Sequence, residues 1–566
     1  MPNRRNQIIH SYVPTGLLVW FLFWLIPHYD HTERIILFAA FVVVPLTLYR
    51  VFESANHTPV IFLNILICLI PIGALALAGS FVLSPGTVSG LLAIPWSLVT
   101  FWIAALGAVR FAKSSGNLAD VSKAIGFLYI SVGGIWLVAH QFGFPLLGFQ
   151  GHIMLLTVNH FHYAGFVTPV LFGFLHDRIE KKSLSSMVVM LGGITPILIA
   201  LGITYSPILE WLSVVVFTLS LLLYSILVFA YVVPKVTSWT KGLHIVSSGV
   251  IWITMALAVT YGFGEWIGQP TISISTMILF HGWGNAVLFS FIGVLAWHAT
   301  LMDQATAGIP FSRIQGKGKI GASVFADLDV LDPTPQKKPT GLIDDMQAYH
   351  SKPCNPNLLD PDIIEFYEHT NDYELHLTPH WSRAFQLPAK VYKTMSQWLE
   401  QMNFPLEAET SDLQVKSVIL PIQDGKDGRD HVRAWVRTYT KSQKAIYAAL
   451  YSTHLSEGTR YMNIAFPLPY SQMTSILRLR NGPNDTLLLT SWPHEGTSGD
   501  QGVYLVINQK AIRLPINETI TVWKDPDSPK GKIEAKHDMW LFGMKFLTLD
   551  YSIFKKSQGE DASMPR

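Results

Sequence analysis

The stretch LTVNHFHYAGFVTP (residues 156–169) places an asparagine, two histidines and a tyrosine in a run that is otherwise apolar. The whole run, 149–175, contains no Asp, Glu, Lys or Arg and exceeds the roughly 20 residues that a helix needs to cross a bilayer. Inside the hydrocarbon core an unpaired polar group is costly, so these side chains need partners or a function. The stretch therefore predicts a helical membrane domain with a polar site inside it.

Similar apolar runs recur through the first half of the chain. Half of the 566 residues are hydrophobic and 14% are charged, against roughly 25% charged in soluble domains. The runs predict about ten membrane-spanning helices in a transmembrane domain over 1–301. We expect these spans at 11–28, 34–49, 60–83, 88–109, 122–141, 149–175, 185–204, 208–232, 243–264 and 273–298. The first is expected to stay in the chain, because no small-residue cleavage site follows it.

Basic residues in the loops indicate the orientation of the spans. If the N-terminus is cytoplasmic, the outer loops hold Arg34 alone, and the other basic residues of this half fall at inner positions. These are Arg4, Arg5, Arg50, Arg110, Lys113, Lys123, Arg178, Lys181, Lys182, Lys235 and Lys241. Such a bias follows the positive-inside rule. With an even number of spans it also places the C-terminal half in the cytoplasm.

Two of the spans carry polar side chains at overlapping depth. With a rise of about 1.5 Å per residue, His160 and His162 fall near mid-membrane. On the last span, His281 and Asn285 reach a similar depth, and their four-residue spacing puts them on one helix face. His160 and His162 are two residues apart, so they point to opposite sides and cannot both ligate one ion from a regular helix.

We interpret this pattern as a buried polar site, open toward the outside, that handles a proton, an ion or a small ligand. Its expected members are His160, His162, His281, Asn285, Asn159 and Tyr163. His140 and His152, at the outer ends of the fifth and sixth spans, are expected to line the access path. The alternative is packing alone, because an intramembrane histidine can simply donate a hydrogen bond to a neighbouring helix.

The order HFHY at 160–163 also resembles the HFHY helix of haem–copper oxidase catalytic subunits, in which the two histidines ligate two haems. That local resemblance implies haem as a cofactor, with His160, His162 or His281 as axial ligands. The chain lacks a clear set of further histidines for the copper site of such oxidases. A haem-binding membrane redox protein is therefore an alternative function.

The chain changes character after residue 301. The stretch 302–345 is rich in Gly, Pro and Lys and is expected to be a linker. Beyond it, 346–566 is expected to form a cytoplasmic α+β domain with a mainly antiparallel, curved sheet. Its expected helix is 387–402, and its expected strands are 415–422, 431–440, 445–454, 474–480, 486–492, 502–507, 518–523 and 546–554.

No catalytic signature appears in this C-terminal half. It has no Walker loop, no G-x-S-x-G and no paired-cysteine zinc spacing, so its sequence does not decide whether the chain is an enzyme. Cys68 lies in an apolar run and Cys354 in the C-terminal half, which indicates neither a disulfide framework nor a thiolate metal site. A net charge of +2 gives no indication of a nucleic-acid partner.

Taken together, HFHYAGF (160–166), HGWGN (281–285) and the tail WLFGMKFLTLDYSIFKK (540–556) resemble the YndJ family of bacterial membrane proteins. The resemblance implies a location in the bacterial inner membrane and a transporter-like label without an established substrate. The preferred hypothesis is a transporter-like membrane protein, and the alternatives are the haem protein and a membrane anchor for a cytoplasmic binding domain. The expected partners are the lipid bilayer and a small ligand or ion, and no protein partner is identified.

Overall fold

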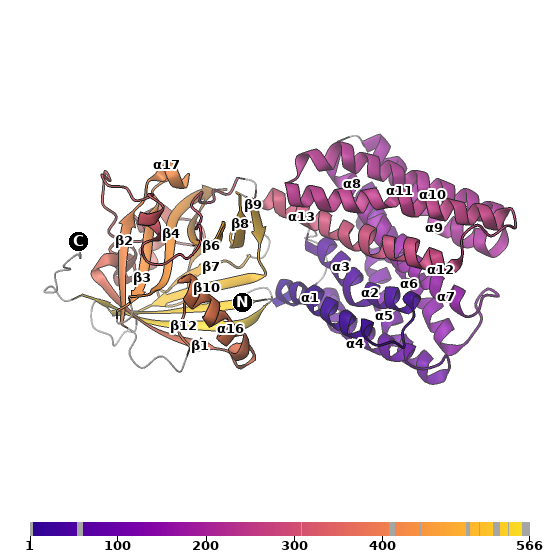
Figure 1. Cartoon of the computed structure of the whole chain (residues 1–566), viewed down its shortest axis with the longest axis horizontal. Coiled ribbons are helices and arrows are strands. Elements are labelled where there is room, and N and C mark those ends of the chain that lie inside the picture. The colour runs from indigo at the N-terminus through magenta and orange to yellow at the C-terminus, as the bar shows by residue number, and fades with distance from the viewer. Residues whose placement is uncertain are drawn as a thin grey trace. The chain divides into compact units, whose positions relative to one another are not determined.

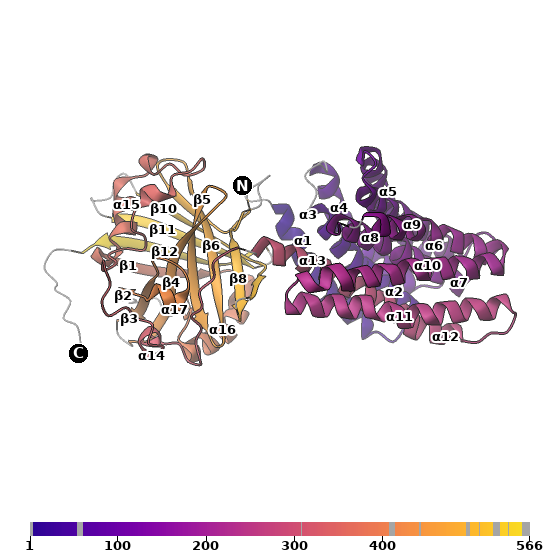
Figure 2. The same ribbon diagram turned by 90° about the horizontal axis from the view of Figure 1, so that it is seen from above.

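The structure is a computed structural model that describes residues 4–53, 60–180, 182–306, 308–406, 414–440, 443–493, 499–508, 510–524, 532–541 and 543–556. The chain divides into two compact units, one within Ile8–Gln304 and one that takes in Ala305–Arg566. The first is built of helices and the second mainly of strands, and Figures 1 and 2 draw each from two directions.

The helical unit follows the apolar runs of the sequence. Its helices are α1 (Arg4–Trp24), α2 (His31–Phe38), η1 (Ala39–Val43), α3 (Val44–Glu53), α4 (Val60–Phe81), α5 (Thr87–Lys113), α6 (Leu118–Phe142), α7 (His152–His160), η2 (Phe161–Val167), α8 (Thr168–Arg178), α9 (Lys182–Tyr205), α10 (Pro207–Leu227), η3 (Val228–Val232), η4 (Val233–Lys235), α11 (Ser238–Trp266), α12 (Ile274–Thr276), η5 (Met277–Gly282), η6 (Gly284–Phe291) and α13 (Ile292–Thr306). The segments η1, η2, η3, η5 and η6 are π-helical turns within longer helices.

Seven helical stretches of the described residues are long and apolar enough to cross a membrane. They are His31–Phe52, Thr87–Lys113, Leu118–Phe142, Lys182–Tyr205, Pro207–Lys235, Ser238–Trp266 and Ile274–Leu301. The expectation of about ten spans is therefore corrected to seven candidates. The stretch from α7 to α8 is helical but falls outside this set, because its asparagine and histidines lower its mean hydropathy. Within α1 and α4, the apolar stretches of the described residues are the shorter Val13–Trp24 and Cys68–Phe81.

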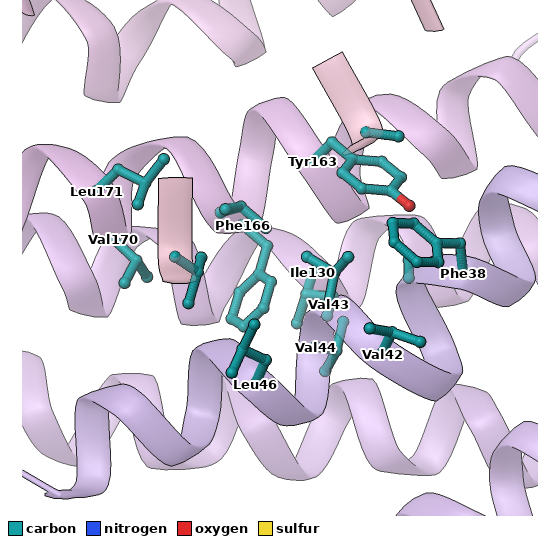
Figure 3. Packing of buried hydrophobic residues seen from close by; sticks show 14 of the residues in the cluster. Phe38, Val42, Val43, Val44, Leu46, Ile130, Tyr163, Phe166, Val170 and Leu171 are labelled. Atoms are coloured by element: carbon teal, nitrogen blue, oxygen red, sulfur yellow. The ribbon is translucent and has the colours of Figure 1, made fainter. Parts of the chain in front are cut away.

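Apolar side chains from several helices form the core of the helical unit. Val43 of η1 and Val44 of α3 lie beside Ile130 of α6, and Phe166 of η2 lies next to them (Figure 3). All of these side chains are fully buried. The core therefore ties the π-helical turn that follows His160 to the helices that surround it.

The second unit contains twelve strands in one sheet. They are β1 (Tyr373–Trp381), β2 (Gln414–Pro421), β3 (Arg433–Tyr439), β4 (Ala445–Ser456), β5 (Thr459–Leu468), β6 (Ser471–Asn481), β7 (Leu487–Thr490), β8 (Gly502–Ile507), β9 (Lys510–Arg513), β10 (Ile516–Trp523), β11 (Lys532–Leu541) and β12 (Met544–Lys555). Its helices and turns are α14 (Val324–Asp327), η7 (Met346–Tyr349), η8 (Pro356–Leu358), α15 (Pro361–Glu368), η9 (Thr370–Asp372), η10 (Arg383–Phe385), α16 (Gln386–Leu399) and α17 (Asp424–Asp427).

The sheet closes on itself. The strand order is β5-β4-β3-β2-β1-β12-β11-β10-β7-β6-β8-β9, and β5 also pairs with β6, so all strands except β8 and β9 form a closed antiparallel ring of ten. The expected α+β domain with an open, curved sheet is therefore wrong, and the domain is a β-barrel. Most of the strands were expected, but alternation of apolar residues is the same in a barrel and in an open sheet. Closure depends on register, namely the antiparallel pairing of β5 with β6 from Tyr461↔Arg478 to Leu468↔Ser471.

Apolar side chains line the inside of the barrel and also cover part of its outside. The interior cluster draws residues from every strand of the ring, including Ile419, Leu477 and Ile533. A second cluster, with Phe325 and Val436, lies on the other face of β2 to β5. Burial on both faces explains why the β3 sequence alternates so weakly between apolar and polar residues.

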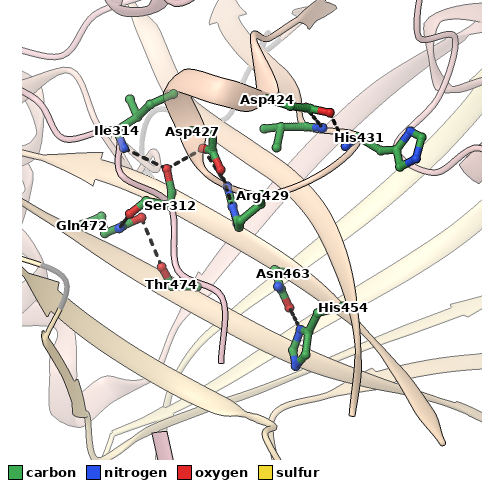
Figure 4. Close-up of polar contacts among 11 residues, drawn as sticks. Ser312, Ile314, Asp424, Asp427, Arg429, His431, His454, Asn463, Gln472 and Thr474 are labelled. Atoms are coloured by element: carbon green, nitrogen blue, oxygen red, sulfur yellow. Dashed lines mark hydrogen bonds and ion pairs between the residues drawn. The ribbon is translucent and has the colours of Figure 1, made fainter. Parts of the chain in front are cut away.

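Much of the stretch 302–345 lies against the barrel. Phe311 packs on Tyr504, and Ser312 donates a hydrogen bond of 2.5 Å to Asp427. Asp427 also accepts bonds of 2.6 and 3.1 Å from Arg429, and both of these residues are buried (Figure 4). The part expected to be a linker therefore makes specific contacts with this unit.

Candidate functional site

His162 is held by bonds at both ring nitrogens. Its ring is fully buried in η2, with Nδ1 2.8 Å from the Val158 carbonyl oxygen and Nε2 3.0 Å from Nε1 of Trp96 on α5. An indole N–H only donates and a carbonyl only accepts, so the ring is a neutral imidazole with its proton on Nδ1. The Trp96 and His162 rings also lie nearly parallel, with centroids 6.1 Å apart. These contacts leave His162 no free lone pair, which makes it a packing residue in this arrangement.

Gly133 of α6 makes room for the His162 ring. A Cβ atom at this glycine would lie 2.8 Å from Nδ1 and 2.9 Å from Cε1 of His162. Contacts this short do not occur between a Cβ atom and a ring, so one of the two groups would have to move. The glycine and the two bonds of the ring therefore fix its position together.

His160 points away from His162 and approaches a second histidine. Its Nδ1 lies 2.9 Å from the Leu156 carbonyl oxygen, and its side chain is exposed. On the last helix, Nδ1 of His281 lies 2.8 Å from the Thr254 carbonyl oxygen of α11. His160 is close enough to His281 to interact with it electrostatically. The helices that carry the two residues are in contact where η2 meets η6, and we call His160 and His281 the inner pair.

Both imidazoles of the inner pair present the same nitrogen. Because a carbonyl oxygen accepts, each ring donates through Nδ1–H and carries its lone pair on Nε2. The Asn285 amide nitrogen lies 3.3 Å from both ring nitrogens of His281, so its contact is shared between them. The Thr254 hydroxyl donates a 2.9 Å bond to Oδ1 of Asn285 and so holds this amide in place.

Asn159 of α7 and Tyr163 of η2 form hydrogen bonds to α2. The Asn159 amide donates to the Thr32 carbonyl oxygen at 3.2 Å, and the Tyr163 hydroxyl donates to the Ile35 carbonyl oxygen at 2.8 Å (Figure 3 shows Tyr163). Oδ1 of Asn159 is buried without a hydrogen-bond partner among the described residues. These two residues therefore position the helix, and the Asn159 oxygen is left as an acceptor.

His140 and His152 form a separate group with Asp30 and Thr32, which we call the outer cluster. Nε2 of His152 is 3.0 Å from the Thr32 hydroxyl, and its Nδ1 is 3.7 Å from an Asp30 carboxylate oxygen. His140 interacts electrostatically with both His152 and Asp30. Thr32 links this cluster to Asn159 through its carbonyl oxygen. Asn159 directly precedes His160 in the sequence, so its bond to Thr32 connects the outer cluster to the helix that carries His160.

The sequence interpretation missed several partners of these histidines. In the sequence, Trp96 and Thr254 look like ordinary residues of apolar spans. Asp30 and Thr32 lie near the N-terminal edge of a short expected span. A buried indole N–H needs an acceptor, which could have pointed to Trp96 as a partner of an intramembrane histidine. No signal in the sequence marks Thr254, because threonine is common in membrane helices.

The donor set limits which metal groups the site can hold. Among the described residues, no group of three or more His, Cys, Asp or Glu side chains could hold a metal ion. His162 could ligate haem only by giving up its bond from Trp96. In the inner pair, each ring has its lone pair on Nε2. The two histidines can therefore act as proton acceptors or as ligands.

A helical unit whose described residues include seven candidate spans, together with its buried polar groups, defines a multi-pass membrane protein. A relative from Bacillus subtilis (strain 168), named "Uncharacterized membrane protein YndJ", is 35% identical over 477 residues, which are 83% of this chain and 85% of the relative. The family model described as YndJ-like protein matches residues 34–289, which include both histidine motifs. The chain belongs to the YndJ-like family. No solved structure matches it.

Proposed function

We propose that this membrane protein is transporter-like and handles a proton, an ion or a small ligand at the inner pair, with access through the outer cluster. The observation that carries the proposal is the convergence of His160 and His281 from separate helices, each with its lone pair on Nε2. A proton is the simplest ligand for two neutral imidazoles that lack a third metal ligand. The π-helical turns η2, η5 and η6 at these motifs support a functional role, since such turns are frequent at functional sites.

Asn285 and Asn159 have supporting parts in this proposal. Asn285 would orient a ligand or a protonated His281 through its side-chain amide, which the hydrogen bond from Thr254 holds in place. The unpartnered Asn159 oxygen would accept a hydrogen bond from a hydrated proton on its way from His152. Tyr163 and His162 would keep the helix in place.

The proposed orientation places the N-terminus and the barrel in the cytoplasm of a bacterial cell, with the protein in the inner membrane. The distribution of basic residues between the expected loops supports it. A reporter fused after residue 566 that is active only outside the cytoplasm would test it. Activity of that reporter would contradict the orientation.

The proton hypothesis is tested with the full-length protein in liposomes that contain the pH-sensitive dye pyranine. Under an imposed pH gradient we expect faster proton uptake than in empty liposomes. His160→Gln and His281→Gln should abolish this excess, and His28→Gln, in a histidine outside the site, should keep it. Equal uptake by all three variants and the wild type would contradict a proton function of the inner pair.

The same preparation tests haem binding. A visible absorption spectrum with a Soret band that disappears in His160→Gln and His281→Gln would assign the inner pair to haem and overturn the proton proposal. A spectrum without such a band, together with the uptake result above, supports it.

A further inference from the structure

The interior of the barrel contains an arginine, Arg437, that is fully buried on β3. Three aromatic rings surround its guanidinium group. The ring centroids of Trp435, Tyr447 and Tyr551 lie 5.1, 5.4 and 5.3 Å from the guanidinium carbon. These residues come from β3, β4 and β12, so the group reaches across the barrel. Arg437 is therefore enclosed on several sides and belongs to the interior of the domain.

Most of the hydrogen-bonding capacity of Arg437 is unused. Nη1 lies 3.4 Å from the Tyr447 hydroxyl, a long bond, and the Tyr551 hydroxyl also interacts with the guanidinium group. Nε and Nη2 are buried without a hydrogen-bond partner among the described residues. These two nitrogens form one edge of the planar guanidinium group, with their N–H bonds directed to the same side. This edge is the fork that binds both oxygens of a carboxylate.

Arg437 also differs from the other buried arginines of this domain. Arg429 is paired with Asp427 at 2.6 Å, and Arg433 is paired with Asp344 at 2.7 Å. None of the ion pairs between described residues involves Arg437. Since guanidinium remains charged in proteins, Arg437 is a buried cation without a carboxylate partner.

The neighbouring tyrosines do not supply the missing negative charge. Burial raises the pKa of Tyr447, Tyr451 and Tyr551 above the ordinary tyrosine value, so their hydroxyls stay neutral. The Glu518 carboxylate lies in the same interior, near Tyr551, but it is bound to His537 at 2.7 Å and forms no ion pair with Arg437. The groups in contact with the Arg437 guanidinium are neutral tyrosines, whose hydroxyls can donate a hydrogen bond to an anion.

We propose that the barrel binds the carboxylate of an amphipathic molecule, such as a fatty acid, at the Nε–Nη2 edge of Arg437. Leu477, Ile533 and Ile553 are among the buried apolar residues of the same interior, and they would contact the aliphatic tail. Barrel diameter grows with strand number, and closed barrels of about eight strands can already hold one small ligand, whereas this ring has ten strands. This site is separate from the inner pair and does not depend on the proposed function.

Calorimetric titration of the full-length protein in detergent tests the proposal, with decanoate, acetate and inorganic phosphate as probes. We expect decanoate to bind, and Arg437→Met and Arg437→Lys to weaken it at least tenfold, while Arg480→Met leaves it unchanged. Arg437→Lys keeps the charge but loses the fork. Binding of acetate or phosphate alone would assign the site to a small free anion, without a tail subsite, and overturn the amphipathic part of the proposal.

Stability measurements keep the proposal falsifiable if a variant binds poorly because it misfolds. An unpaired buried cation destabilises the ligand-free barrel, so Arg437→Met should melt at the same or a higher temperature than the wild type. A large fall in melting temperature would show that Arg437 is structural. Unchanged decanoate binding in a stable Arg437→Met variant would equally overturn the site.

A different observation concerns helix α16, whose apolar side chains face outward. Leu387, Val391, Met395 and Trp398 are 74%, 70%, 57% and 68% exposed. Their spacing of four, four and three residues puts them on one stripe, which we call the α16 stripe. The opposite face is buried although it includes Lys393, whose Nζ donates to the Phe404 carbonyl oxygen at 3.1 Å. The helix therefore has the reverse of the usual amphipathic arrangement.

We infer that the α16 stripe inserts into the surface of the lipid bilayer. The barrel is tethered to the membrane, because its first packed apolar residue, Ile309, follows α13 within a few residues. The tether keeps the bilayer at a high effective concentration near the domain. A stripe of aliphatic residues with a tryptophan is typical of helices that lie in the interface of a membrane.

Spin labels on the full-length protein in nanodiscs test this inference. Met395→Cys on the stripe and Leu455→Cys on the β4–β5 hairpin, also an exposed leucine, are labelled in a Cys68→Ser background. We expect the label at 395 to be accessible to oxygen and protected from a water-soluble nickel chelate, and the label at 455 to show the reverse. Equal nickel accessibility at both positions would overturn the inference, as would dipolar coupling at 395 that reports a second copy of the chain.

Discussion

Replacing Gly133 by alanine tests whether His162 is as rigidly held as the structure indicates. The new methyl group would lie 2.8 Å from Nδ1 and 2.9 Å from Cε1 of the ring. The ring cannot move away freely, since it is bonded to the Val158 carbonyl oxygen and to Trp96. Gly249→Ala is the matched control, because a Cβ atom at this helical glycine of α11 meets no atom within 4 Å.

The magnitude follows from two opposing effects. Alanine stabilises a helix by about 1 kcal/mol relative to glycine, and this gain is common to both variants. Overpacking a filled interior costs about 1–3 kcal/mol, and this cost applies to Gly133→Ala alone. Loss of a hydrogen bond of the ring would add about 0.6 kcal/mol, the average for such bonds in membranes. We therefore expect the free energy of unfolding of Gly133→Ala to be about 1–3 kcal/mol below that of Gly249→Ala.

Unfolding in mixtures of dodecyl sulfate and mild detergent, followed by circular dichroism, measures this difference. A second comparison removes the ring: in a His162→Ala background, Gly133→Ala should lose most of its penalty. Equal stability of Gly133→Ala and Gly249→Ala would refute the reasoning. So would a penalty that persists without the ring, because the methyl group would then collide with something else.

Further predictions concern the barrel. Asp427→Asn should lower the free energy of unfolding by about 3–5 kcal/mol in chemical denaturation, since it leaves the buried Arg429 unpaired, and a loss below 1 kcal/mol would contradict this role. Burial raises the pKa of the Cys354 thiol to about 11, so with the other cysteine replaced a maleimide should label this residue only after unfolding. Burial is the largest single influence on Glu518 and favours its protonation, but the hydrogen bond and electrostatic interaction with His537, together with a hydrogen bond from Ser475, outweigh it and lower the pKa below 4.5. The stability due to Glu518 is therefore present above pH 4.5 and lost as the pH falls through the lowered pKa, and Glu518→Gln should flatten this acid limb of the stability curve.

The sequence predicts the helical half well because its signal is local. A run of apolar residues long enough to cross a membrane needs no tertiary information, and the helices follow these runs. Among the described residues, the expected span from α7 to α8 is not a candidate, because its polar residues lower the mean hydropathy of the run. The opposite directions of His160 and His162 also follow from helix geometry alone, although their different roles do not.

The roles of the histidines depend on residues that are distant in the sequence. Trp96 is 66 positions from His162, and it is this donor that makes His162 a packing residue. Thr254 is 27 positions from His281 and sets its tautomer through a backbone carbonyl, which no side-chain pattern reveals. Closure of the barrel is undetermined by the sequence for the same reason, since it requires the pairing of particular strands.

The pairing of β1 with β12 sets an order on the synthesis of the barrel. Its partners run from Tyr373↔Lys555 to Trp381↔Leu547, so the first strand of the domain is matched with the last. A chain emerging from the ribosome cannot complete the ring until nearly its final residues are available, and contacts of such long sequence separation form slowly. Until then β1 lacks one neighbour, and a chain that stops before Met544 would leave two strand edges open to aggregation.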